Sequence, residues 1–150
     1  MPQLLEPSAT WSAARQDEFI SNQFNPCVGT RLLSQDRRVR VWEVRLKPSE
    51  RLGFHRHVLD YFWVAIAPGR ARSHQQDGTV VEAAYVAGQT SHLTYGPGEF
   101  KIHDLENIGD TELIFTTVEF LDSANPPLPL PSEIAVGPQG AGSAETEDFL

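Results

Sequence analysis

The most informative stretch of the chain is Gly53-Phe54-His55-Arg56-His57-Val58-Leu59-Asp60-Tyr61-Phe62-Trp63, which places two histidines one residue apart. In an extended chain every second side chain points to the same face, so His55 and His57 share a face. Two imidazoles on one face are able to hold a single divalent ion. Because an isolated pair of this kind is common by chance, a metal site needs a third ligand. The downstream stretch His103-Asp104-Leu105-Glu106-Asn107-Ile108-Gly109-Asp110 supplies the candidate, His103.

Most of the chain is predicted to form short strands separated by turns. Residues 39–46 alternate apolar and polar side chains, which is typical of a strand. Asp77-Gly78 is the strongest hairpin signal in the sequence. The other expected strands cover 30–33, 52–57, 61–66, 70–76, 79–87, 90–95, 100–107 and 113–121. Roughly eight to ten short strands with hardly any helix indicate an all-β sandwich or barrel.

The two ends of the chain differ from this strand pattern. Residues 1–29 are expected to form an N-terminal arm with one short helical turn around Ala13 to Phe19. Residues 30–121 form the expected barrel. Residues 122–150 begin with a proline-rich run and end in a Gly/Ala/Glu-rich segment, so we expect a strap on the barrel followed by a loose acidic tail.

Composition limits the class of protein. The chain of 150 residues suits one domain. The net charge is −8, and no basic stripe is present, so nucleic acid is not an expected partner. A single cysteine, Cys27, excludes an internal disulfide and fits a reducing compartment, which makes the cytoplasm the expected location. No segment reaches the roughly 18 apolar residues of a membrane span, so a membrane is not expected either.

The histidine motifs resemble those of a small single-domain cupin, a family of jelly-roll (double-stranded β-helix) barrels. The first cupin motif contains a glycine, an HxH pair and a further glycine, which Gly53, His55, His57 and Gly69 match. The second ends in a histidine followed four residues later by asparagine and then often by glycine and aspartate. The matching residues are His103, Asn107, Gly109 and Asp110. The resemblance covers about Thr30 to Leu121.

The sequence departs from the cupin pattern in two places. The slot of the usual glutamate ligand holds Tyr61, and Asp60 lies one residue earlier, on the opposite face by alternation. The segment between the middle turn and the second motif is also longer than usual, and counting from Gly88 would place Glu99 in the ligand slot. We favour His103, because the residues that follow it fix the register from the other side.

The resemblance implies a three-histidine metal site at His55, His57 and His103. A divalent transition metal is the expected cofactor, with Fe²⁺ preferred and Zn²⁺, Ni²⁺ or Mn²⁺ as alternatives. Tyr61 is the candidate catalytic residue, a hydrogen-bond donor beside the metal. Small barrels hold one small ligand, and the candidate substrate-binding residues are Trp63, Asn107 and His92.

Three functions remain open at the level of sequence. The first is a metal-dependent enzyme on a small organic metabolite, most plausibly a dioxygenase-like Fe²⁺ enzyme. The second is a binding or sensing cupin without turnover, and the third is a metal-free structural dimer. We expect a homodimer in each case, because several large apolar residues of the arm would cross to a partner barrel. These are Leu4, Leu5, Trp11, Phe19 and Ile20.

Overall fold

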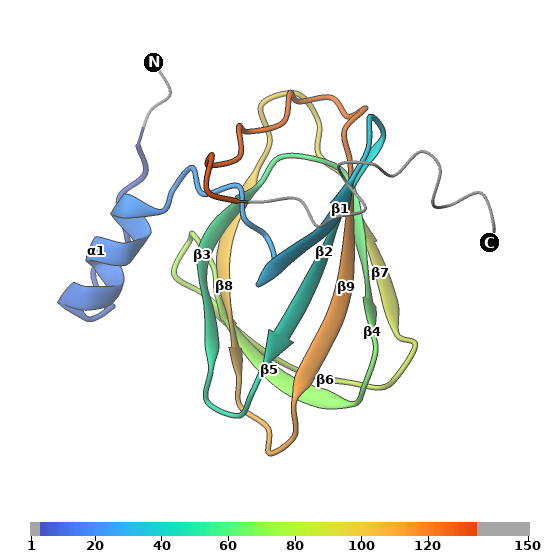
Figure 1. Ribbon diagram of the computed structural model, residues 1–150. Coiled ribbons are helices and arrows are strands. Elements are labelled where there is room, and N and C mark those ends of the chain that lie inside the picture. The colour runs from blue at the N-terminus through green and yellow to red at the C-terminus, as the bar shows by residue number, and fades with distance from the viewer. Residues whose placement is uncertain (1–3, 135–150) are drawn as a thin grey trace.

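The computed structural model describes residues 4–134, which contain one helix and nine strands. The elements in chain order are α1 (Ala13–Ser21), β1 (Arg31–Gln35), β2 (Val39–Leu46), β3 (Arg51–His57), β4 (Tyr61–Ala65), β5 (Gly69–His74), β6 (Val80–Tyr85), β7 (Thr90–Leu93), β8 (Lys101–Asn107) and β9 (Leu113–Phe120). The strands form two antiparallel sheets, β1-β2-β9-β4-β7 and β3-β8-β5-β6, that face each other as the walls of a barrel (Figure 1). The predicted all-β barrel is therefore confirmed.

Alternation along β2 builds one half of the core. Trp42, Val44 and Leu46 point inward, and each is at most 3% exposed. β2 pairs with β9 along its full length, from Val39 opposite Phe120 to Leu46 opposite Leu113. The apolar cluster at the end where β2 stops and β9 starts consists of Val44, Leu46, Ala65, Ala71, Leu113 and Phe115. This apolar end of the barrel is filled by aliphatic side chains and by Phe115, with Trp63 and Tyr85 packed against them.

The histidine strands β3 and β8 pair in the second sheet. Their register places His55 opposite His103 and His57 opposite Lys101, after an irregularity between Leu52 and His55. Because β3 runs back antiparallel from the turn that follows β2, its last residue, His57, lies far from the apolar end. The histidines therefore occupy the other half of the barrel interior.

The predicted hairpin at Asp77-Gly78 joins β5 to β6. Gly78 has a φ of +90°, a backbone conformation that only glycine adopts without strain. Its N–H donates to the carbonyl of Gln75 at 2.9 Å, and the carboxylate of Asp77 accepts from the N–H of Thr79 at 3.0 Å. This turn aligns His74 with Val80 and so sets the register of the whole β5–β6 pair.

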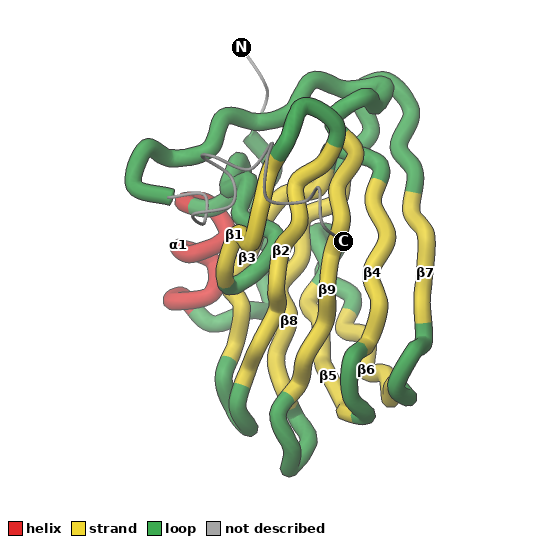
Figure 2. The backbone as a smooth tube through the Cα atoms, turned by 45° about the vertical axis from the view of Figure 1, so that its right-hand side comes forward, coloured by secondary structure: helices red, strands yellow, loops and turns green. Residues whose placement is uncertain are grey.

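The N-terminal arm packs on the outside of its own barrel. Helix α1 lies beside β3 (Figure 2), and Ser12 caps it by accepting from the N–H of Arg15 at 3.2 Å. Trp11 and Phe19 bury their rings against Phe54 of β3 and Ile102 of β8. Within residues 4–134 no helix is long and apolar enough to cross a membrane.

This packing changes the expectation for the arm. Trp11 and Phe19 are covered by their own chain rather than by a partner, whereas Leu4 and Ile20 remain 57% and 47% exposed. The large apolar residues of the arm therefore give only weak support for a dimer, and the homodimer stays a prediction.

The segment after β9 lies against the first sheet. The carbonyl of Leu128 accepts from Nη2 of Arg40 at 3.2 Å, and Leu130 packs on the cluster of Val28, Leu32 and Trp42. The amide of Asn125 donates to the carbonyl of Gly96 at 3.0 Å. The predicted loose tail falls mostly on residues 135–150, which lie outside the described residues.

Replacement of Phe19 tests how far the barrel depends on the arm. Phe19 is fully buried and contacts Trp11 and Phe54 edge-on. We expect Phe19→Ala to lower the free energy of unfolding by about 3–5 kcal/mol, because a buried ring leaves a cavity. Chemical denaturation measures this change, with Ile20→Ala, one residue away and exposed, as the control. An equal and small effect of both substitutions would show that α1 is not part of the cooperative unit.

Candidate metal centre

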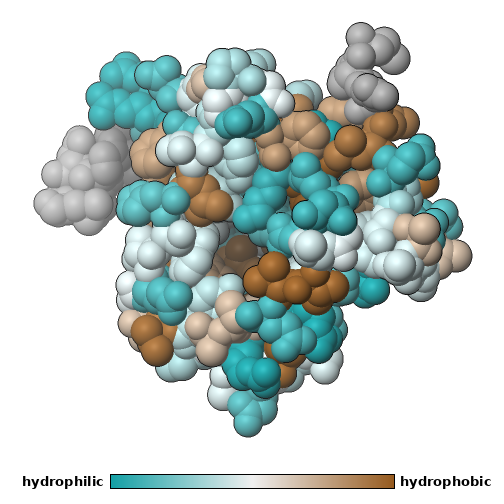
Figure 3. Space-filling view, turned by 180° about the vertical axis from the view of Figure 1, so that it is seen from behind, coloured by the Kyte–Doolittle hydropathy of each residue, from teal (hydrophilic) through white to brown (hydrophobic). Residues whose placement is uncertain are grey.

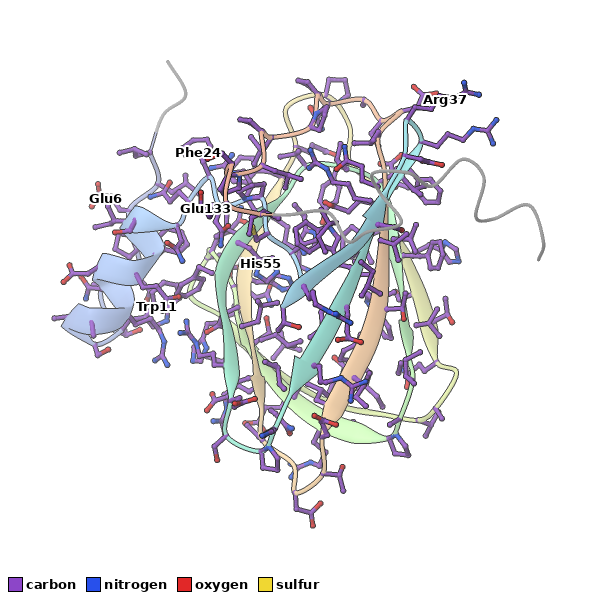
Figure 4. The ribbon with its side chains drawn as sticks, in the orientation of Figure 1. Glu6, Trp11, Phe24, Arg37, His55 and Glu133 are labelled. Carbon is purple, nitrogen blue, oxygen red and sulfur yellow. The ribbon has the colours of Figure 1, made fainter. Side chains whose placement is uncertain are left out.

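Three histidines from two neighbouring strands converge inside the barrel. One side-chain nitrogen from each of His55, His57 and His103 lies within 4.8 Å of the others. Nε2 of His57 and Nε2 of His103 are 3.1 Å apart, and the ring centroids of His55 and His103 are 4.7 Å apart. Figure 4 shows His55 between the two sheets. The register of β3 with β8 brings the three rings together.

Hydrogen bonds to Nδ1 orient two of the rings. Nδ1 of His55 lies 2.8 Å from the carbonyl of Gly53, which only accepts, so His55 carries its proton there. Nδ1 of His103 lies 3.2 Å from Oγ of Ser73, which donates its own proton to the carbonyl of Asp104 at 2.6 Å. His103 is therefore the donor to Ser73. In both rings Nε2 keeps a free lone pair, as a metal ligand requires.

Burial keeps the three imidazoles neutral. Loss of water lowers the pKa of His55 to about 4. Desolvation likewise lowers the pKa of His57 and of His103 well below the usual value. Metal ions bind the neutral form of imidazole, so no proton has to leave these rings at neutral pH.

The spacing of one pair of nitrogens fits a shared metal ion. Two nitrogens bound to one metal at about 2.0–2.1 Å lie about 3.0–3.4 Å apart at octahedral to tetrahedral angles. The 3.1 Å between Nε2 of His57 and Nε2 of His103 falls in this interval. Two lone pairs at this distance repel unless a cation or a proton lies between them. The donor set and the spacing of this pair therefore fit a divalent transition metal, and the nitrogen of His55, within 4.8 Å of both, would complete the set by a small shift of its ring.

The histidines line a cavity of about 270 Å³. This volume is just below the ~300 Å³ at which pockets for drug-sized ligands begin, so it suits a small metabolite. Seen from behind the view of Figure 1, the surface is hollowed and apolar side chains show in the recess (Figure 3). The lining residues are Val28, Val44, Leu52, His55, His57, Tyr61, Trp63, Ser73, Gln75, Val81, Tyr85, Ser91, Leu93, Lys101, His103, Leu105, Phe115 and Thr117.

Solved structures share this architecture. A cupin domain from Bordetella pertussis Tohama I is 26% identical in sequence, with a TM-score of 0.51 over 61% of this chain and 98% of that chain. The chain has the cupin fold. A conserved protein with a double-stranded β-helix domain from Klebsiella pneumoniae is 23% identical, with a TM-score of 0.50 over 79% of this chain and 94% of that chain. Neither a protein-family model nor a curated protein matches the sequence.

A more distant structural match contains a metal. The oxalate decarboxylase of Bacillus subtilis, which has Mn(II) centres, is 25% identical over 55% of this chain and 21% of that chain, with a TM-score of 0.43. This score is too low to support a shared activity or a shared metal.

Tyr61 and Trp63 both line the cavity. The ring of Tyr61 stacks on that of His57 at 4.1 Å, with 11° between the planes. Burial raises the pKa of Tyr61 well above its usual value, so the phenol keeps its proton. Trp63 meets Tyr85 and Phe115 edge-on at 5.4 and 5.3 Å. Tyr61 thus lies beside the histidines, and Trp63 lies toward the apolar end.

Two predicted substrate-binding residues lie outside the cavity lining. The side chain of Asn107 donates to the carbonyls of Leu46 and Thr111 and accepts from the N–H of Gly109, so it closes the turn after β8. His92 is exposed, and its ring lies 5.3 Å from that of Phe62. Its neighbours Ser91 and Leu93 line the cavity instead, because alternation along β7 turns His92 outward.

The alternative carboxylate ligands are also accounted for. Asp60 accepts from the N–H of Tyr95 at 2.9 Å, which fixes the loop after the histidine pair. Glu99 is exposed and accepts from the N–H of Gly96 in a turn. Neither carboxylate belongs to the cluster around His103.

Sequence reasoning missed two polar residues at the site, Ser73 and Lys101. Ser73 orients His103 from the neighbouring strand β5, a contact between residues 30 positions apart that no local pattern shows. The position of Lys101, by contrast, could have been predicted from the sequence. It stands two residues before His103 on the same strand, so alternation turns both side chains into the cavity.

Removal of the Ser73 hydroxyl tests its effect on the metal. We expect Ser73→Ala to weaken metal binding by roughly 10–100-fold, because the outer hydrogen bond fixes both the tautomer and the orientation of the ligand His103. Competition with a chelator of known affinity measures the change. Ser91→Ala, also on the cavity wall, is the matched control and should bind metal as the unchanged protein does. Equal affinities for all three proteins would contradict an orienting role for Ser73.

Proposed function

We propose that this cupin is a metal-dependent enzyme that acts on a small organic metabolite in the barrel, with Fe²⁺ held by His55, His57 and His103. One observation carries the proposal: three neutral imidazoles converge on the wall of a cavity of small-metabolite size. The hydrogen bonds to Gly53 and Ser73 support it, because they engage Nδ1 of two rings and leave Nε2 as the nitrogen for a metal.

The reaction class follows from the donor set. If these three imidazoles hold Fe²⁺, the metal would supply oxygenase chemistry. The protein supplies the enclosure: the histidines lie in a cavity whose other end is lined by apolar side chains such as Val44, Leu52 and Phe115. An oxygen-dependent reaction on one small substrate is the activity that this arrangement supports best.

Tyr61 is the proposed proton donor. Its phenol keeps its proton because of burial, and its ring is held by stacking on His57. A protonated phenol beside the ligands donates a hydrogen bond to a substrate oxygen and so stabilises negative charge that develops there. At the position where cupins usually carry a carboxylate ligand, Tyr61 would therefore donate a hydrogen bond to the substrate instead of binding the metal.

A binding or sensing role is the second candidate, because the same cavity and donors hold a ligand without turnover. Oxygen consumption by the Fe²⁺-loaded protein separates the two roles. Uptake that depends on an added small acid or thiol supports the enzyme. Tight ligand binding without uptake for any member of such a panel supports the binding role.

Loss of either of two histidines tests the metal site. We expect His57→Ala and His103→Ala to lose most of the bound metal, because two imidazoles are a weak set for one ion. Elemental analysis after purification in the presence of metal measures this loss, and circular dichroism shows whether the barrel is still folded. His92→Ala, an exposed histidine outside the cavity, is the control. Full metal content in both ligand variants would place the metal elsewhere in the chain.

Removal of one oxygen atom tests Tyr61. We expect Tyr61→Phe to keep the metal and to lower kcat by roughly 10²–10⁴-fold, because a phenyl ring preserves the stacking on His57 but donates no proton. Turnover and metal content are measured on the same preparation. The matched control is Tyr85→Phe, which removes a hydroxyl from the apolar end of the same cavity. Unchanged turnover in Tyr61→Phe would leave Tyr61 a packing residue.

A further inference from the structure

Lys101 is the only charged residue other than histidine on the cavity wall formed by the described residues. It begins β8 directly opposite His57, the last residue of β3. Alternation along β8 turns Lys101, His103 and Leu105 to the same side, and all three line the cavity. The ammonium group thus belongs to the same end of the cavity as the three histidines.

The protein itself does not balance this charge. No aspartate or glutamate lines the cavity, and Lys101 takes part in none of the ion pairs of residues 4–134. The buried carboxylate of Glu119 accepts from Nε1 of Trp42 at 2.8 Å and lies outside the cavity lining. A half-buried ammonium without a carboxylate partner is costly, because it has lost part of its water.

The charge of Lys101 lies beside the candidate metal ligands, because Lys101 stands opposite His57 and two residues before His103. An anion in the cavity would compensate the ammonium group and stabilise it.

The other buried cations have partners away from the cavity. Arg40 donates to Gln35 and to the carbonyl of Leu128. Arg56 donates to the carbonyl of Gln23 and lies over the ring of Phe100 at 4.0 Å. Of these cations, Lys101 is thus the one that faces the cavity.

The rest of the cavity has the opposite character. Leu52 pairs with Leu105 three residues before His55, toward the apolar end of the barrel. Trp63, Tyr85 and Phe115 meet edge-on there, with ring centroids 5.0–5.4 Å apart. These side chains pack on the core cluster of Val44 and Leu46. The cavity therefore changes along its length from cationic and polar to apolar and aromatic.

We infer that the ligand of this cavity is a small organic acid whose carboxylate lies between Lys101 and the histidine cluster and whose apolar body lies against Trp63, Tyr85 and Phe115. This inference rests on the proposed function for the metal and adds the substrate class. The carboxylate balances the ammonium group, and the aromatic wall disfavours a second carboxylate, since none of the described residues that line that end of the cavity is positively charged.

Binding calorimetry on the Zn²⁺-loaded protein tests the inference without turnover. The probes are phenylacetate and hexanoate, their neutral amides, and adipate, which has a carboxylate at each end. We expect both monocarboxylates to bind and to be preferred over the amides and adipate. Lys101→Met should weaken binding of phenylacetate by roughly 10–100-fold, because a charged hydrogen bond is lost, and Lys101→Arg should keep part of it.

The chain provides a matched control. It has only one other lysine, Lys47, which is exposed in the turn after β2. Lys47→Met removes the same charge outside the cavity and should bind phenylacetate like the unchanged protein. Lys101→Met with unchanged affinity for phenylacetate, equal binding of acids and amides, or no binding of any probe to the unchanged protein would each overturn the inference.

Metal content separates this inference from the proposed function. If the protein binds phenylacetate through Lys101 but retains no metal at the three histidines, the result supports the acid site and contradicts the proposed metal-dependent enzyme. If the metal is retained and replacement of Lys101 leaves acid binding unchanged, the result supports the metal site and contradicts the acid site. Elemental analysis of every variant before calorimetry distinguishes the two results.

Discussion

The antiparallel pairing of β3 with β8 is the constraint on which the rest of the site depends. Its register sets His55 opposite His103 and His57 opposite Lys101, so four polar side chains from segments 44 or more residues apart meet on one wall. If β8 slipped by one residue against β3, Lys101 and His103 would turn to the other face, away from His55 and His57. The hydrogen-bonded ladder therefore positions the chemistry, and the loops do not.

The outer face of the same two strands explains why the barrel carries an arm. Residues that alternate with the histidines, such as Phe54 and Asp104, are fully buried under α1 and its flanking chain. Asp104 accepts from Nε of Arg51 at 2.8 Å, and Arg51 also donates to both carboxylate oxygens of Glu18 in α1. A strand fixed on both faces has little freedom to shift. We therefore interpret α1 as a support for the ligand strands.

Alternation explains both what the sequence predicted and where it failed. It correctly placed His55 and His57 on one face, and the motif after His103 identified the third member of the cluster. Alternation also turned Asn107 toward the cavity, but Asn107 is not among the residues that line it. Asn107 ends β8, and its side chain donates to the carbonyls of Leu46 and Thr111, which would otherwise lack donors. Alternation could not show that Ser73 contacts His103, because strand order within a sheet depends on long-range packing.

The replacement of a carboxylate by Tyr61 and the presence of Lys101 are two parts of one charge arrangement. Three neutral imidazoles leave the charge of a divalent metal uncompensated, and Lys101 adds a further positive charge at the same end of the cavity. A low-dielectric wall makes such charge expensive unless an anion accompanies it. With a glutamate in the slot of Tyr61, the protein would supply that anion itself. With a phenol there, the organic acid that we infer as the ligand supplies the compensation, and its preference over a neutral ligand follows from the charge that the protein leaves unbalanced.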